Sequence, residues 1–154
     1  MIIETIFSTI GKNGSPNFAP MGLQWGDEFV TVRPYRSTQT YSNLAANGYG
    51  VANISDNVLA YVECGLYDMS LPHFPAKIAP GVVFSDTCSW YELQVTANDG
   101  AGDRAVIKCR IIHKETRREF LGFCRASHAV IESAILATRL ALSGPDKVAD
   151  KLKY

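Results

Sequence analysis

Apolar and polar residues alternate with a period of two along much of this chain, a pattern that predicts β-strands. Turn-rich segments at 11–16 and 98–103 separate neighbouring strands and indicate hairpins. Several short strands with few helices favour a mainly β fold, a barrel or a sandwich. We expect strands over residues 1–10, 18–25, 29–32, 50–54, 58–64, 90–97 and 105–113.

One short segment follows helical spacing instead. Over residues 39–46, Tyr41 and Leu44 fall on one face, and Gly48 stands where a C-terminal helix glycine is expected. Ser37 or Thr38 is the expected N-cap, because hydroxyl side chains accept from free N–H groups of the first turn.

A second, longer helix is expected over residues 122–142. Its interior is nearly all Ala, Ile, Leu and Val, which predicts burial on most sides. Arg125, His128, Glu132 and Arg139 form a polar stripe along it, since residues three and four apart are neighbours on a helix. Two interpretations remain open for Arg125 and His128: a ladder within the helix, or the border of a ligand cavity. For Glu132 and Arg139 we favour a structural role.

Residues 67–81 carry Pro72, Pro75 and Pro80 among aromatic and apolar residues, so we expect a long irregular segment there. Such a segment is either a lid over a binding site or a plain connector. After Ser143 the sequence changes to a short charged stretch. We therefore expect one domain over residues 1–143 and a short C-terminal tail over 144–154.

Composition narrows the functional classes. Of the 154 residues, 47% are hydrophobic and 19% are charged, which suits a globule with a subunit interface. Lys+Arg and Asp+Glu both number 15, so no net field attracts nucleic acid or an anionic membrane. No apolar run approaches the roughly 20 residues of a membrane span, and the N-terminus lacks a signal-peptide pattern. We expect a cytoplasmic protein.

The cysteines are widely scattered, at positions 64, 88, 109 and 124. They form no closely spaced pair, so no metal site is expected, and free, mostly buried thiols are the interpretation we favour.

The segment that carries chemistry lies between the strand at 29–32 and the short helix. Arg33 and Arg36 flank a proline, and Ser37 and Thr38 follow at once. The first turn of a helix has free backbone N–H groups and the positive end of the helix dipole. Two guanidinium groups beside such a turn favour a bound phosphate. The alternative is a solvated strand end.

This segment resembles the phosphate-binding segment of flavin reductase-like proteins in the FMN-binding split-barrel superfamily. There too a strand ends in an Arg/Ser/Thr cluster, a short helix follows, and the next strand carries a Val-x-Asn, here 51–53. The sequences NFAPMG (17–22) and GFCRASHAVIESAILATRL (122–140) are similar to those of a compact FMN-binding family of unknown function within it. The resemblance implies a dimeric split β-barrel with FMN at the dimer interface, one long C-terminal helix and one short helix.

The resemblance and the residue chemistry together give a set of expected FMN contacts. The phosphate is assigned to Arg36, Ser37 and Thr38, with Arg33 in support. The flavin ring is expected beside the strand that holds Ala19, Pro20, Met21 and Gly22, because small, flat residues permit close approach. The remaining expected contacts are Asn53, Ser55, Trp90, Arg125 and His128. Asn53 and Ser55 have an alternative as turn formers, and Trp90 as a core or interface residue.

These features lead to an FMN-dependent oxidoreductase of unknown substrate as the first functional hypothesis, with a nicotinamide as one electron donor that fits. The protein would form a homodimer. No catalytic residue is assigned, and no GxGxxG motif follows a strand to suggest a Rossmann site. Two alternatives remain: a noncatalytic flavin carrier, and a split-barrel dimer module without cofactor.

Overall fold

The computed structural model describes residues 1–122 and 124–143; the tail expected over 144–154 lies outside the described residues. In chain order the elements are β1 (Ile2–Ile10), β2 (Pro16–Trp25), β3 (Phe29–Val32), α1 (Gln39–Asn47), β4 (Tyr49–Ile54), α2 (Val58–Leu66), β5 (His73–Pro75), β6 (Val82–Phe84), β7 (Ser89–Asp99), β8 (Val106–Thr116) and α3 (Arg125–Ser143).

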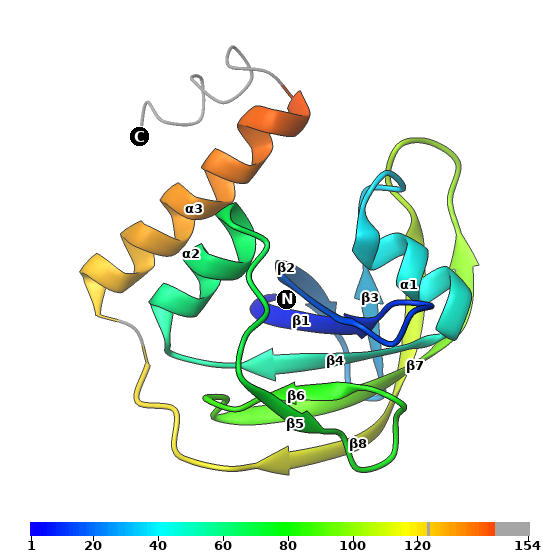
Figure 1. Cartoon of the computed structure of the whole chain (residues 1–154), viewed down its shortest axis with the longest axis horizontal. Helices are drawn as coiled ribbons and strands as arrows, with labels where there is room; N and C mark the ends of the chain where they lie inside the picture. Colours follow the sequence, from blue (N-terminus) through cyan, green and yellow to red (C-terminus); the bar gives the residue numbers. More distant parts are fainter. Residues whose placement is uncertain (123, 144–154) are drawn as a thin grey trace.

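The strands close into a six-stranded barrel in the order β1-β2-β3-β8-β7-β4, and every neighbouring pair is antiparallel (Figure 1). The expected mainly β barrel and both expected hairpins are confirmed. The short strands β5 and β6 form a separate two-stranded sheet.

The barrel interior holds the first apolar core. It is built from the inward positions of the alternating strands, among them Phe7, Leu23, Val30, Leu93 and Ile107. Gly50 on β4 faces the Phe7 ring so closely that an added Cβ would come 2.4 Å from the ring carbon Cζ. The alternating apolar residues of the sequence therefore form the barrel core, and Gly50 leaves space for the Phe7 ring.

The short helix α1 forms as the sequence predicts. Thr38 is its N-cap, and the Thr38 hydroxyl accepts from the Tyr41 N–H. Gly48 ends the helix in the left-handed region, with φ 73°, a conformation that glycine adopts at little cost.

The strand expected over 58–64 is wrong, because this segment is helix α2. The Asn57 side chain caps it by accepting from the Ala60 N–H at 3.1 Å. Ala60, Tyr61 and Cys64 are the buried positions, a helical spacing that outweighs the β-branched Val58 and Val62.

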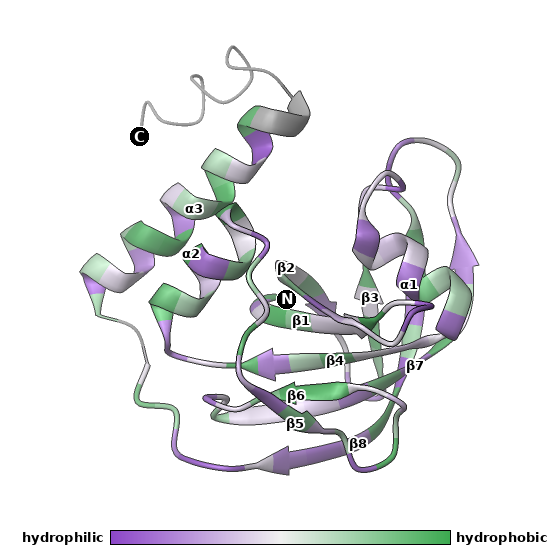
Figure 2. Ribbon diagram, in the orientation of Figure 1, coloured by the Kyte–Doolittle hydropathy of each residue, from purple (hydrophilic) through white to green (hydrophobic). Residues whose placement is uncertain are grey.

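The long helix α3 is confirmed, but within a single chain it is not buried on most sides. Of its described side chains only Ile131 and Ala134 are buried, whereas Val130 and Leu140 are 44% and 45% exposed. Figure 1 shows α3 packed along α2 at one side of the barrel, and Figure 2 shows apolar residues along much of the length of α3. A second apolar core fills the space beneath the two helices, with Phe18, Tyr61 and Phe84 as its largest members.

The proline-rich segment 67–81 contains β5 and is fastened to the barrel. The carboxylate of Glu92 on β7 is fully buried and accepts from the N–H groups of Lys77, Ile78 and Ala79 at 2.7–2.8 Å. The Trp90 indole N–H donates to the same carboxylate at 3.2 Å.

The thiols are free, as expected. Cys64, Cys88 and Cys109 are buried and Cys124 is exposed. In the part of the chain that the structure describes, no group of three or more His, Cys, Asp or Glu side chains could hold a metal ion. No helix among these residues is long and apolar enough to cross a membrane.

Candidate functional site

The start of α1 has the features expected of an anion site. The Thr38 cap satisfies the Tyr41 N–H, but the N–H groups of Gln39 and Thr40 have no acceptor within the helix, as holds for any first turn. The helix dipole adds partial positive charge at the same place. The backbone alone thus offers two donors to a phosphate.

Arg36 lies beside this turn but is engaged elsewhere. Its Nε donates to the Gly102 carbonyl at 3.0 Å, and its Nη2 donates to the Gly100 carbonyl. Its Nη1 donates to the Tyr41 hydroxyl at 2.6 Å. Arg36 therefore links the tip of the β7–β8 hairpin to α1 by hydrogen bonds. Its assignment to the FMN phosphate stays a prediction.

Arg33, Ser37 and Arg104 supply groups that are not engaged in this way. All three are exposed, and the Arg33 and Ser37 side chains make no hydrogen bond or ion pair with another described residue. The Arg104 guanidinium lies 4.2 Å from the centre of the Tyr35 ring, and an isolated bridge joins these two residues. Arg104 was missed in the sequence because it sits 66 positions beyond Thr38, and only the barrel brings it here.

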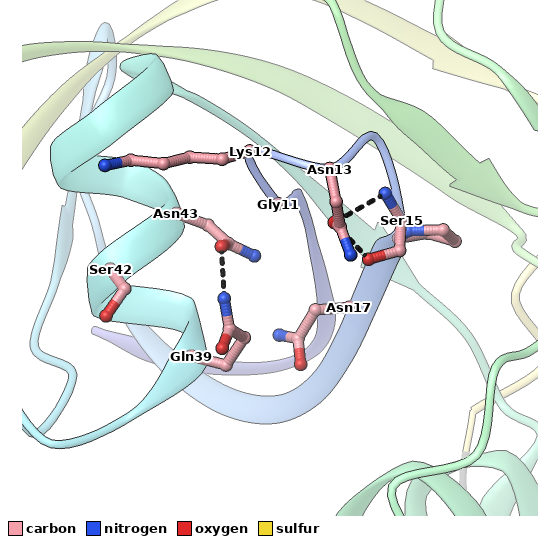
Figure 3. Close-up of a pocket in the computed structure, with 9 residues that line it drawn as sticks. Gly11, Lys12, Asn13, Ser15, Asn17, Gln39, Ser42 and Asn43 are labelled. Carbon is pink, nitrogen blue, oxygen red and sulfur yellow. Dashed lines mark hydrogen bonds between the residues drawn. The ribbon is translucent and has the colours of Figure 1, made fainter.

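A polar groove runs next to the same helix, between α1 and the β1–β2 turn (Figure 3). Its cavity volume is about 590 Å³. Its lining contains several carboxamides and one lysine, and no aromatic or acidic side chain: Gly11, Lys12, Asn13, Ser15, Pro16, Asn17, Gln39, Ser42 and Asn43. None of these residues was predicted as a site residue, because GKNGSP in isolation indicates only a turn.

The expected ring-binding strand lies in β2, where its residues alternate between two faces. Met21 packs toward the barrel core. Pro20 faces α2, where a Cβ on Gly65 would come 2.9 Å from Pro20 Cγ. Gly22 is exposed and lies beside the half-buried Glu4.

Residues 19–22 therefore do not line one continuous surface for a flavin ring, because Met21 packs toward the barrel core and Pro20 faces α2. The pKa of the neighbouring Glu4 is raised, first by burial and then by repulsion from Glu132, while Arg139 lowers it. Glu132 and Arg139 of the α3 stripe thus act on the Glu4 carboxyl of β1, and the structural role favoured for them stays a prediction.

Asn53 and Ser55 are bonded inside the fold. The Asn53 amide donates to the Ile6 carbonyl and its oxygen accepts from the Phe84 N–H, both at 2.9 Å. The Ser55 hydroxyl donates to the Asp86 carbonyl at 2.8 Å. Both side chains cross-link neighbouring segments, and their role as flavin contacts stays a prediction.

Trp90 is buried, with 3% of its surface exposed, and it packs edge-on against Phe74 with ring centres 5.7 Å apart. Arg125 and His128 are exposed on the first turns of α3. Figure 1 shows α3 and α1 on different sides of the barrel, so within a single chain Arg125 and His128 lie away from the start of α1.

A comparison with protein families identifies the family of this chain. The model of the protein of unknown function (DUF447) N-terminal domain matches residues 3–118. The chain belongs to the DUF447 family. The predicted membership of a family of unknown function is confirmed.

Solved structures share the fold of this DUF447 protein. An FMN-bound DUF447 protein from Methanosarcina mazei is 20% identical, with a TM-score of 0.81, over 97% of this chain and 80% of that one. Flavoredoxin from Methanosarcina acetivorans is 18% identical, with a TM-score of 0.69, over 79% and 72%. Nitrilotriacetate monooxygenase component B from Bacillus cereus is 16% identical, with a TM-score of 0.65, over 81% and 75%.

In this DUF447 protein the described residues thus form two separate polar regions near α1. One is the helix start with Arg33, Ser37 and Arg104, which suits a phosphate because it combines cations with N–H and O–H donors. The other is the polar groove between α1 and the β1–β2 turn. The α3 residues Arg125 and His128 form a third region on the far side.

Proposed function

We propose that this DUF447 protein binds FMN and serves as a flavin-dependent oxidoreductase. The observation that carries the proposal is the unsatisfied, positively charged start of α1, with Arg33 and Ser37 exposed and without partners among the described residues. The FMN-bound family member, which shares the fold over 97% of this chain, supports it.

The phosphate would bind the first turn of α1, held by Arg33, Arg36 and Ser37. Thr38, also assigned to the phosphate from the sequence, has no donor left, because its N–H and its hydroxyl both donate to the Tyr35 carbonyl, at 3.0 and 2.7 Å. Arg36 has one N–H left on each terminal nitrogen after its three hydrogen bonds. It can therefore meet a phosphate without leaving the hairpin. Arg104 would add a further cation at the same corner.

The isoalloxazine would lie along the β2 backbone at residues 19–22, with Trp90, Asn53 and Ser55 supporting the strands around it. Bound FMN supplies hydride and electron transfer. The chain supplies orientation, backbone hydrogen-bond donors and acceptors, and shielding from water. No side chain is assigned an acid–base role.

We also propose a homodimer, because the protomer leaves apolar side chains uncovered around α2 and α3. Leu59, Tyr67 and Leu121 are 63%, 69% and 83% exposed, and Val130 and Leu140 of α3 are exposed as well. A second protomer would also bring its own Arg125 and His128 toward the flavin of the first.

Light scattering coupled to gel filtration should give twice the 16.9 kDa chain mass at micromolar concentration. Val130→Glu, on the uncovered side of α3, should shift the mass to one chain without lowering helix content. A monomeric wild-type protein would contradict the dimer.

The function is tested by the absorbance spectrum of the purified protein. A flavin spectrum with one FMN released per chain on denaturation is the expected result, and its absence after FMN is supplied would leave only a cofactor-free module. Rapid bleaching of the bound flavin by a reduced nicotinamide would indicate an oxidoreductase. A flavin that stays oxidised with reduced nicotinamides and other donors would indicate a carrier.

A further inference from the structure

The groove between the β1–β2 turn and α1 is a candidate second site. Its volume, about 590 Å³, falls within the roughly 300–1,000 Å³ typical of small-molecule pockets. Its lining differs from that of most such pockets, because it has no aromatic side chain and is rich in carboxamides. It suits a ligand made of hydroxyl groups rather than a flat apolar ring.

Hydrogen bonds within the lining orient the carboxamides. Asn43 is buried, donates to the Thr9 hydroxyl at 3.0 Å and accepts from the Gln39 amide at 2.6 Å. The Asn17 amide donates to the Thr40 hydroxyl at 3.2 Å. The amide nitrogens of Gln39 and Asn17 thus donate to other residues of the protein. Their carbonyl oxygens remain as acceptors for a ligand.

Asn13 has the opposite orientation. Its carbonyl oxygen accepts from the Ser15 N–H at 3.1 Å and from the Ser15 hydroxyl at 2.6 Å, so its amide N–H groups remain as donors. The turn is braced by a bond from the Gly11 N–H to the Ser15 carbonyl at 2.8 Å. The groove is thus formed before any ligand arrives, which lowers the entropic cost of binding.

Lys12 adds the one charge of the lining. Its side chain is exposed and makes no ion pair with any described residue. Figure 3 shows it running along one edge of the groove toward α1, while Gln39 and Asn17 lie on the opposite side. An anionic group at one end of a ligand and hydroxyl groups further along would match this arrangement.

We propose that the groove binds a small polyhydroxylated anion, of the sugar-phosphate class, at a site separate from the flavin. The anionic group pairs with Lys12. Hydroxyl groups donate to the carbonyl oxygens of Gln39 and Asn17 and accept from the Asn13 amide. The groove adjoins the proposed phosphate site through Gln39, so a ligand there would sit next to the flavin tail.

D-ribose 5-phosphate is the probe, titrated by calorimetry into the protein saturated with FMN. We expect saturable binding of one molecule per chain. Lys12→Met and Gln39→Met should each weaken it about tenfold, the loss of one good hydrogen bond. Lys108→Met and Gln94→Met are matched controls on exposed strand positions outside the groove and should bind as wild type.

Three results would overturn the proposal: no saturable binding, binding that both groove variants leave unchanged, or equally strong binding of inorganic phosphate. Binding to FMN-free protein that FMN abolishes would also overturn it, because the groove would then hold the flavin tail. The proposal does not depend on the flavin: if the protein holds no FMN, the same titration on the purified chain tests the groove alone.

Discussion

Glu92→Gln should destabilise the protein by about 3 kcal/mol, since buried donors left without a matching acceptor each cost about 1–3 kcal/mol. The Glu92 carboxylate is fully buried and accepts from Lys77, Ile78, Ala79 and the Trp90 indole. An amide of the same shape turns an NH₂ group toward these donors. Urea unfolding of both proteins measures the difference.

Glu115→Gln is the matched control. Glu115 forms an ion pair with Lys77, the same residue whose N–H binds Glu92, but its side chain is 34% exposed. Exposed pairs contribute little, so its loss should change stability far less. Equal effects of the two substitutions would show that the buried carboxylate does not fasten the 76–81 segment.

The Glu92 anchor also predicts a pH dependence. Burial by itself would raise the pKa of this carboxyl, but the backbone N–H groups and the indole outweigh it, and the pKa lies below its usual 4.5. A depressed folded-state pKa adds stability above pH 4.5 that is lost as the pH falls through the folded value. Acid unfolding should be less pH-dependent in Glu92→Gln.

Arg36→Ala should weaken FMN binding by about tenfold to a hundredfold, because a charge-assisted hydrogen bond to phosphate contributes roughly 1.5–3 kcal/mol. Arg33→Met should act in the same direction, without loosening the hairpin that Arg36 clasps. Riboflavin, which lacks the phosphate, should bind wild type and both variants alike. Fluorescence titration measures all these affinities.

Lys108→Met is the control for these variants. The Lys108 ammonium lies 4.2 Å from the Phe29 ring centre on the outer face of the barrel, and its removal should leave FMN affinity unchanged. If Arg36→Ala lowers thermal stability but neither Arg36→Ala nor Arg33→Met alters FMN affinity, the phosphate does not bind at the start of α1. Arg36 then serves only to hold the β7–β8 hairpin against α1.

Arg125→Met is the third arm of the same titration. Arg125 is exposed and bonded to no other described residue, so its loss should leave folding and dimerisation intact. If it reaches a flavin across the dimer, FMN should bind more weakly or become harder to reduce. A lower melting temperature with normal FMN affinity would instead identify an anchor of the strand–helix junction.

Local patterns in the sequence determined much of this protein. Alternation predicted the barrel strands, since a strand with one buried face shows period two. Ser37 or Thr38 at one end and Gly48 at the other marked the bounds of α1, because capping depends on neighbouring residues; the structure then selected Thr38 as the N-cap. The cations and hydroxyls at 33–38 marked the segment to which we assign the phosphate, and together with two further segments they led to the family.

Only the tertiary structure decided which partners distant residues meet. α2 is a helix rather than a strand because Ala60, Tyr61 and Cys64 bury against the barrel and α3, a surface that local propensity does not contain. Arg36 binds carbonyls 64 and 66 positions away, and Glu92 binds a loop 13–15 positions before it. Such contacts depend on barrel closure and register, and the polar groove exists only because the same closure sets the β1–β2 turn beside α1.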